Sequence, residues 1–146
     1  IKNFNVNILF SANLGEELKP LSQIASGGEL SRVMLALKTV FAKCDKTATV
    51  IFDEIDTGVS GEISAKVARI MEEMSQTTQV MAITHLPQIA AKARNHMKVF
   101  KQTSDEKTYT SIMQLSENQR VEEIAKMLSS DILTQSALAT AKELMS

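Results

Sequence analysis

The sequence predicts an α/β fold with a mainly parallel sheet flanked by helices, followed by a β-hairpin and two C-terminal helices. Apolar runs of strand length alternate with segments whose apolar residues recur every three or four positions, which is typical of a parallel sheet covered by helices. The 146 residues are 44% hydrophobic and 23% charged, which suits one globular domain. The net charge of -1 indicates no general preference for nucleic acid or membrane surfaces.

The first part of the chain contains a predicted strand, an irregular stretch and a long helix. Polar and apolar residues alternate over residues 4–10, as in a half-buried strand. Residues 16–25 lack such a period and contain Pro20, so we expect them to be irregular. A helix is expected from near Gly28 to near Lys43, because its apolar residues are spaced by three and four.

The central strand is expected at Val50-Ile51-Phe52, where three consecutive apolar residues predict burial on both faces of a parallel sheet. It ends in two acids, Asp53 and Glu54. Isolated charges are costly to bury, so acids at a strand tip are usually solvated, paired or bound to a metal. Because ligands bind at the carboxyl ends of strands in open α/β sheets, this pair is a candidate site. Taken alone, two solvated acids explain it equally well.

The remaining elements follow in alternation. Residues 55–61 are rich in turn formers, and the segments after them predict a helix to Met74, a strand over residues 79–84 ending at His85, and a short helix opened by Pro87. Residues 97–102 and 108–115 predict the hairpin. Ser116 and Gln119 have the spacing of a capping box, so a helix should start there, and a last helix should reach Met145.

The first long helix opens with Ser26-Gly27-Gly28-Glu29. A helix N-terminus presents unpaired N–H groups and partial positive charge, and glycines let an oxyanion approach the backbone closely. The stretch is therefore a candidate phosphate site. An ordinary capped helix after a Gly-Gly turn is the alternative.

Four motifs stand in the order found in the C-terminal lobe of ABC-type ATPases, which the chain resembles: residues 26–29 resemble the signature motif, Asp53-Glu54 the Walker B acids, residues 55–61 the D-loop, and His85 the switch histidine. The continuation Ile55-Asp56-Thr57-Gly58 resembles the branch with the structural-maintenance-of-chromosomes (SMC) proteins, and most of all the RecN family of bacterial DNA-repair proteins. Further matches to that family lie at residues 25–32, 35–38, 84–90, 123–128 and 141–144.

The resemblance implies a role for each motif residue. Asp53 would hold Mg²⁺, Glu54 would polarise the attacking water, and His85 would contact the γ-phosphate of ATP. The signature residues would contact ATP held by a second head, so a homodimer is implied; they are Ser26, Gly27, Gly28 and Glu29. Asp56 would lie at the interface between the two heads, or it simply caps a turn.

The Walker A sequence Gly-x-x-x-x-Gly-Lys-Ser/Thr is absent, since none of the five glycines precedes a lysine. We therefore expect residues 1–146 to be one domain, the C-terminal lobe of an ATPase head, and to be inactive alone. The resemblance implies an N-terminal lobe and a coiled coil elsewhere in the same protein, DNA reached through the full-length protein, and a cytoplasmic, nucleoid-associated location without a membrane partner.

Two alternatives stand beside this interpretation. A transporter ATPase subunit commonly carries Pro-Thr after the Walker B acids, whereas Glu54 is followed here by Ile55. A non-catalytic head that binds nucleotide for assembly only does not need a base, so Glu54 and His85 argue against it.

Overall fold

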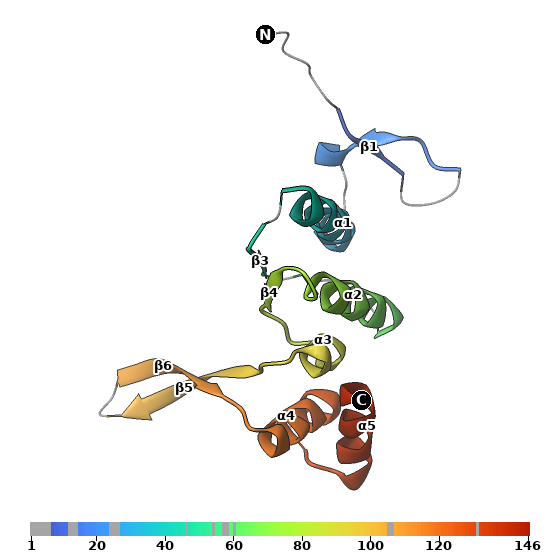
Figure 1. Ribbon diagram of the computed structural model, residues 1–146. Helices are drawn as coiled ribbons and strands as arrows, with labels where there is room; N and C mark the ends of the chain where they lie inside the picture. Colours follow the sequence, from blue (N-terminus) through green and yellow to red (C-terminus); the bar gives the residue numbers. More distant parts are fainter. Residues whose placement is uncertain are drawn as a thin grey trace. The chain divides into compact units, whose positions relative to one another are not determined.

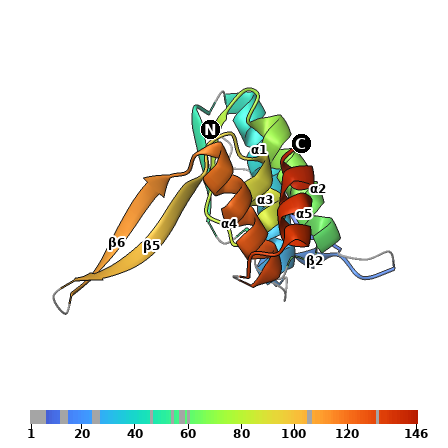
Figure 2. The same cartoon turned by 90° about the horizontal axis from the view of Figure 1, so that it is seen from below.

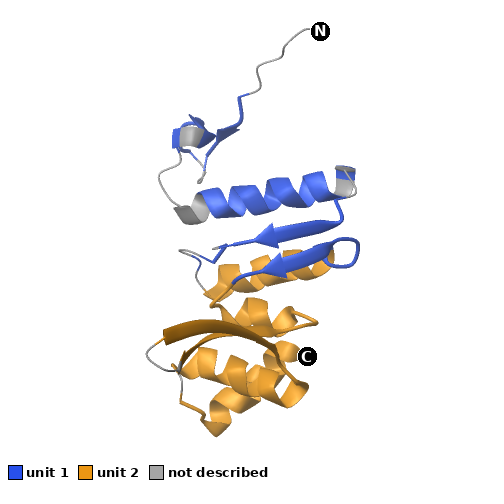
Figure 3. Cartoon of the chain, turned by 90° about the vertical axis from the view of Figure 1, so that its left-hand side faces the viewer, with its two compact units in different colours: residues 1–60, 74–83 blue, residues 61–73, 84–146 orange. Residues whose placement is uncertain are grey.

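The structure is a computed structural model that describes residues 7–11, 15–23, 27–45, 47–53, 55–56, 59, 61–104, 107–130 and 132–146 (Figure 1). The chain divides into two compact units, which are taken here one at a time (Figure 3). The first comprises residues 1–60 and 74–83, and the second residues 61–73 and 84–146.

The first unit is built on helix α1 (Gly27–Asp45) and a pair of parallel strands, β3 (Thr49–Phe52) and β4 (Gln79–Ala82). The strands are in register, with Thr49 beside Gln79 and Phe52 beside Ala82. Figure 3 shows α1 running alongside the two strands. Helix and strands were thus predicted in the right places, and the α/β class is confirmed.

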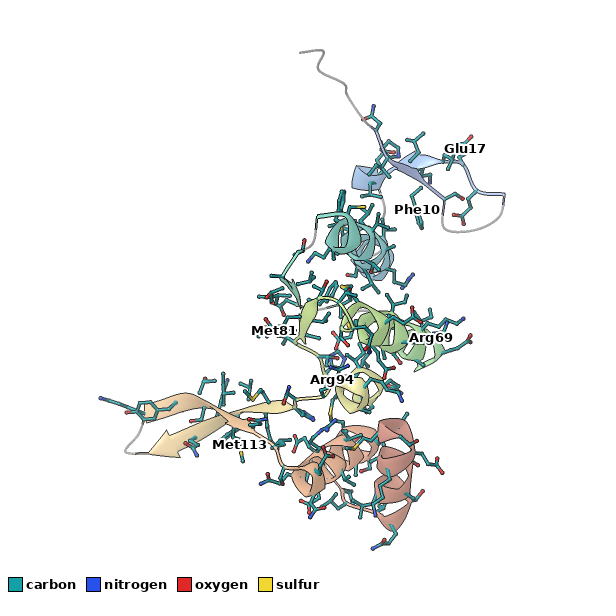
Figure 4. All side chains as sticks on the ribbon, in the orientation of Figure 1. Phe10, Glu17, Arg69, Met81, Arg94 and Met113 are labelled. Atoms are coloured by element: carbon teal, nitrogen blue, oxygen red, sulfur yellow. The ribbon has the colours of Figure 1, made fainter. Side chains whose placement is uncertain are left out.

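The β3–β4 pair is covered on one face and open on the other among the described residues. Val50 and Phe52 are buried, on the face where the Lys38 ammonium of α1 lies 5.1 Å from the centroid of the Phe52 ring. Ile51, Met81 and Ile83 are 54%, 52% and 62% exposed (Figure 4 labels Met81). The expectation that this strand is buried on both faces was therefore wrong, because alternate strand residues face opposite ways and only one face is covered.

A short antiparallel pair precedes α1. Strand β1 (Leu9–Phe10) pairs with β2 (Lys19–Pro20), and a 3-10 turn, η1 (Leu21–Gln23), follows. The stretch predicted to be irregular thus contains a strand and a turn; proline is tolerated in such a peripheral strand, where it need not donate to the ladder. Residues 4–6 of the predicted first strand lie outside the described residues.

The second unit holds helix α2 (Gly61–Met74, with Met74 assigned to the first unit) and three helices that share a core. These are α3 (Pro87–Lys92), α4 (Glu117–Ser129) and α5 (Gln135–Met145), which Figure 2 shows lying together. The buried apolar residues that form this core cluster are mostly small, which lets the helices approach closely; they are Ala90, Ala91, Ile124, Ala125, Ala137 and Ala141.

Local signals fix where these helices begin. The predicted capping box of α4 is present, since the Gln119 side-chain oxygen accepts the Ser116 backbone N–H at 2.9 Å. At α5 the Thr134 hydroxyl accepts the Ala137 N–H at 3.0 Å. No helix in the described part of the chain is long and apolar enough to span a membrane.

The hairpin belongs to the same unit. Strands β5 (Met97–Ser104) and β6 (Lys107–Gln114) pair antiparallel, with Met97 opposite Gln114, as the sequence predicted. The Lys98 ammonium on β5 forms an ion pair with the Glu123 carboxylate of α4 at 2.5 Å. This contact joins the base of the hairpin to the helical core.

Candidate active site

Asp53 stands exposed directly after β3, beside a hollow of about 240 Å³ between that strand and α1. The hollow is lined mainly by apolar side chains, with three polar ones among them: Leu30, Ser31, Met34, Leu35, Lys38, Phe52, Asp53 and Ile55. Because Asp53 is exposed, its side chain is accessible to a ligand from solution. A solvent-facing carboxylate at a strand tip is able to take a hard cation as ligand.

Lys38 connects the signature helix to the strand that carries Asp53. Its ammonium donates a hydrogen bond to the Ile51 backbone carbonyl at 3.2 Å and lies over the Phe52 ring. Both contacts fall within two residues of Asp53. The register of α1 against the end of β3 is therefore fixed by a charged side chain as well as by apolar packing.

Both parallel strands end at the same edge of the pair. Phe52 and Ala82 are partners, and the Ile83 N–H donates to the Phe52 carbonyl at 2.9 Å, so the ladder continues one residue beyond β4. From this edge the chain runs from β3 into Asp53, and from β4 through Ile83 into Thr84 and His85. The carboxyl edge of a parallel pair is where α/β proteins place their ligands.

Asp56 lies in the turn that follows and is 4% exposed. Its backbone carbonyl accepts the Val59 N–H at 3.1 Å. A buried carboxylate is not placed to contact a second molecule in this conformation, so the interface role of Asp56 stays a prediction for the assembled protein.

In the second unit, His85 is exposed and lies between Thr84 and Leu86 in the segment that leads into α3. The Thr84 hydroxyl accepts the Leu86 N–H at 3.0 Å, which closes a hydrogen-bonded ring around His85. Pro87 follows as the first residue of α3, where its missing N–H costs nothing. The imidazole is thus presented to solvent from a restrained backbone.

Comparison with known proteins identifies the family. No protein-family model matches the chain. Three proteins described as "DNA repair protein RecN" are similar to it: that of Treponema pallidum is 50% identical over 97% of this chain, that of Deinococcus radiodurans 48% over 97%, and that of Bacillus subtilis 45% over 96%. The chain spans about a quarter of the length of these relatives, at 25%, 24% and 24%.

The chain belongs to the RecN family. A solved chain from work on "ATP-driven dimerization and DNA stimulated activation of SMC ATPases" has the same fold, with a TM-score of 0.58 over 79% of this chain and 68% of that chain. At 22% sequence identity this likeness concerns the fold alone. It agrees with the predicted α/β fold.

The structure describes some of the predicted site residues and not others. Ser26 and Glu54 lie outside the described residues, as does most of the loop after Asp56. Gly27, Gly28 and Glu29 form the first turn of α1, so the signature motif does open a helix. The roles assigned to all of these residues remain predictions.

Asp53 is the described residue that would hold the Mg²⁺ expected from the sequence. The described residues contain no cluster of three or more His, Cys, Asp or Glu side chains able to hold a metal ion. Mg²⁺ does not need one, since it is usually held by one or two carboxylates with waters and substrate phosphates completing its shell. A single exposed carboxylate at a strand tip matches that mode of binding.

Sequence reasoning missed two residues of this RecN segment, Lys38 and Arg120. Lys38 follows Met34 by four positions in the apolar stripe of α1, and a lysine in such a stripe is a signal for a specific partner. Arg120, on α4, is 7% exposed and reaches backbone carbonyls of the α3 segment. Backbone carbonyls carry no sequence signature, so nothing in the sequence indicated its partners.

Proposed function

We propose that this segment is the C-terminal lobe of a RecN ATPase head, and that the full-length protein hydrolyses ATP between two paired heads to drive DNA double-strand-break repair. The observation that carries the proposal is Asp53, exposed at the carboxyl edge of a parallel pair beside a helix that opens with two glycines. Family membership supports the repair function, since the relatives are described as DNA-repair proteins. The protein would act in the cytoplasm at the nucleoid, with no membrane partner.

In this proposal each ATP lies between two heads. One head supplies Asp53 for Mg²⁺, Glu54 as base toward the attacking water and His85 at the γ-phosphate. The other supplies Ser26, Gly27, Gly28 and Glu29, whose helix N-terminus favours the negative phosphate. A two-fold axis then makes two equal sites, with Asp56 near the interface.

The segment alone does not suffice for this chemistry. Its hollow of about 240 Å³ is below the roughly 300–1,000 Å³ usual for small-molecule sites. The P-loop that supplies most contacts to the β- and γ-phosphates is missing from its sequence. We therefore expect no micromolar Mg-ATP binding and no turnover by the isolated segment, which calorimetry and a phosphate-release assay would measure.

The missing contacts would come from an N-terminal lobe of the same protein. The open face of β3–β4 offers it a docking surface, since Ile51, Met81 and Ile83 are each more than half exposed. Exposed apolar side chains gathered on one sheet face typically mark a contact surface.

The Glu54→Gln variant of the full-length protein tests the proposal. Glutamine is nearly isosteric but cannot accept a proton, and general-base catalysis is typically worth about 10²–10⁴ in rate. ATP binding should persist, hydrolysis should fall by that factor, and heads should accumulate as an ATP-bound dimer. Glu143→Gln, an exposed acid on α5, is the matched control and should leave turnover unchanged. Near-normal turnover in Glu54→Gln would remove this residue from its role and favour a head that binds nucleotide for assembly only.

A further inference from the structure

Four polar or charged residues are buried in the described part of the chain, and two of them, Asp56 and Arg120, are charged. The Arg120 side chain is 9% exposed and comes from the first turns of α4. One terminal nitrogen, Nη2, donates to the Ala93 carbonyl at 2.5 Å and to the Ala91 carbonyl at 3.5 Å. The other, Nη1, forms an ion pair with the Glu117 carboxylate at 2.8 Å.

These contacts fall on the C-terminal end of α3. The last carbonyls of a helix have no partner within it, and a cation there also complements the helix dipole. Helix α3 has only six residues, too short to be stable by itself. The position of α3 therefore depends on packing into the core through Ile89, Ala90 and Ala91 and on the hydrogen bonds that Arg120 donates to its C-terminal end.

Only Leu86 separates His85 from Pro87, the first residue of α3. The Leu86 N–H is bound by Thr84, and the Leu86 carbonyl accepts the N–H groups of Ile89 and Ala90 at 3.1 Å each. Pro87, which follows Leu86 and begins α3, has a φ angle fixed by its ring. A shift or rotation of α3 must therefore move the backbone of His85.

We propose that Arg120 is a positioning residue for His85: by holding the C-terminal end of α3, it sets where the imidazole stands. The proposal rests on the role of His85 given under the proposed function. In the full-length protein, loss of the Arg120 hydrogen bonds should lower kcat for ATP hydrolysis more than it changes KM, because nucleotide binding depends mainly on other contacts. A misplacement on the order of 1 Å costs up to about a hundredfold in rate.

The test uses four variants of the full-length protein, assayed for steady-state and single-turnover ATP hydrolysis and for thermal unfolding. Arg120→Met removes the hydrogen bonds at similar length, and Arg120→Lys keeps the charge but loses the planar fork. Lys98→Met is the matched control, because it removes a second ion pair to the same helix, that with Glu123. His85→Ala tests the proposed function itself.

We expect a roughly ten- to hundredfold lower kcat for Arg120→Met, a smaller loss for Arg120→Lys, and near-normal kcat for Lys98→Met at a comparable loss of stability. In the His85→Ala background, Arg120→Lys should have no further effect on the single-turnover rate. If Lys98→Met lowers kcat as much as the Arg120 variants do, or if the Arg120 and His85 effects multiply, the positioning role is wrong. Should Arg120→Met not fold, Arg120→Lys decides by the same criteria. A His85→Ala protein with normal turnover would instead overturn the role of His85 in the proposed function.

Discussion

Making the open face of β3–β4 polar should weaken its attachment to the rest of the RecN protein while leaving the segment itself nearly unchanged. The triple variant Ile51→Thr, Met81→Gln, Ile83→Thr keeps side-chain size and strand preference close to the original. In the isolated segment these side chains already face solvent, so each change should alter the free energy of unfolding by no more than about 0.5 kcal/mol.

The expected effect on docking follows from the exposed fractions. Full burial of a large aliphatic side chain is worth about 1.5–3 kcal/mol. The three side chains are 54%, 52% and 62% exposed, so covering what remains should contribute roughly 2.5–5 kcal/mol. Since about 1.4 kcal/mol is a tenfold change in affinity, the triple variant should bind between roughly fiftyfold and several thousandfold more weakly.

The assay measures binding of the segment to the remainder of the protein, expressed as a separate chain, by calorimetry. Ile132→Thr is the control, since Ile132 is 68% exposed but lies in the loop between α4 and α5. Sedimentation of the segment alone should also show self-association that the triple variant reduces. Unchanged binding by the triple variant, or an equal loss with Ile132→Thr, would refute the assignment of this face.

Two further predictions concern the second unit. Burial, reinforced by Arg120 and Lys98 and opposed by Glu123, lowers the pKa of His96 from 6.5, so the unfolded chain binds its proton more readily. The contribution of His96 to the free energy of unfolding is therefore complete at higher pH and is lost as the pH falls through about 6.5. Urea unfolding between about pH 7.5 and 5.5 should show this loss of stability. The loss should be smaller in His96→Gln and the same as in the unsubstituted protein in His85→Gln. Separately, Ile124→Ala should lower the free energy of unfolding by about 2–5 kcal/mol, because Ile124 is fully buried in the α3–α4–α5 core. Ile132→Ala should change it by no more than about 0.5 kcal/mol, and equal losses would contradict this account of the core.

The features that the sequence predicted well depend on residues close together in the chain. The capping box of α4 needs only Ser116 and Gln119, and the helices need only spacings of three and four. The order of motifs also singled out Asp53 and His85, whose roles stay predictions. Such signals are local, so a single sequence contains them in full.

The features that the sequence did not predict depend on distant partners. Whether Ile51 is covered depends on which other part of the protein packs against its sheet face. Lys38 binds a carbonyl 13 positions away, and Arg120 binds carbonyls 27 and 29 positions away. Any residue type offers such a carbonyl, so pattern reasoning could not identify these contacts.

The central claim, that Ser26 acts on ATP bound by the partner head, is tested most directly by mixing two inactive full-length variants. Ser26→Arg removes the signature contact, and substitution of the P-loop lysine in the other lobe removes ATP binding. In a mixed dimer one composite site carries both lesions and the other carries neither. The control Ser136→Arg, at an exposed position of α5, should be fully active by itself.

At equal mixing about half of the dimers are mixed and each has one intact site, so up to about a quarter of the wild-type ATPase activity should return. Each variant alone should stay inactive. No recovered activity, although mixed dimers are shown to form, would contradict the claim that the signature motif of one head completes the site of the other.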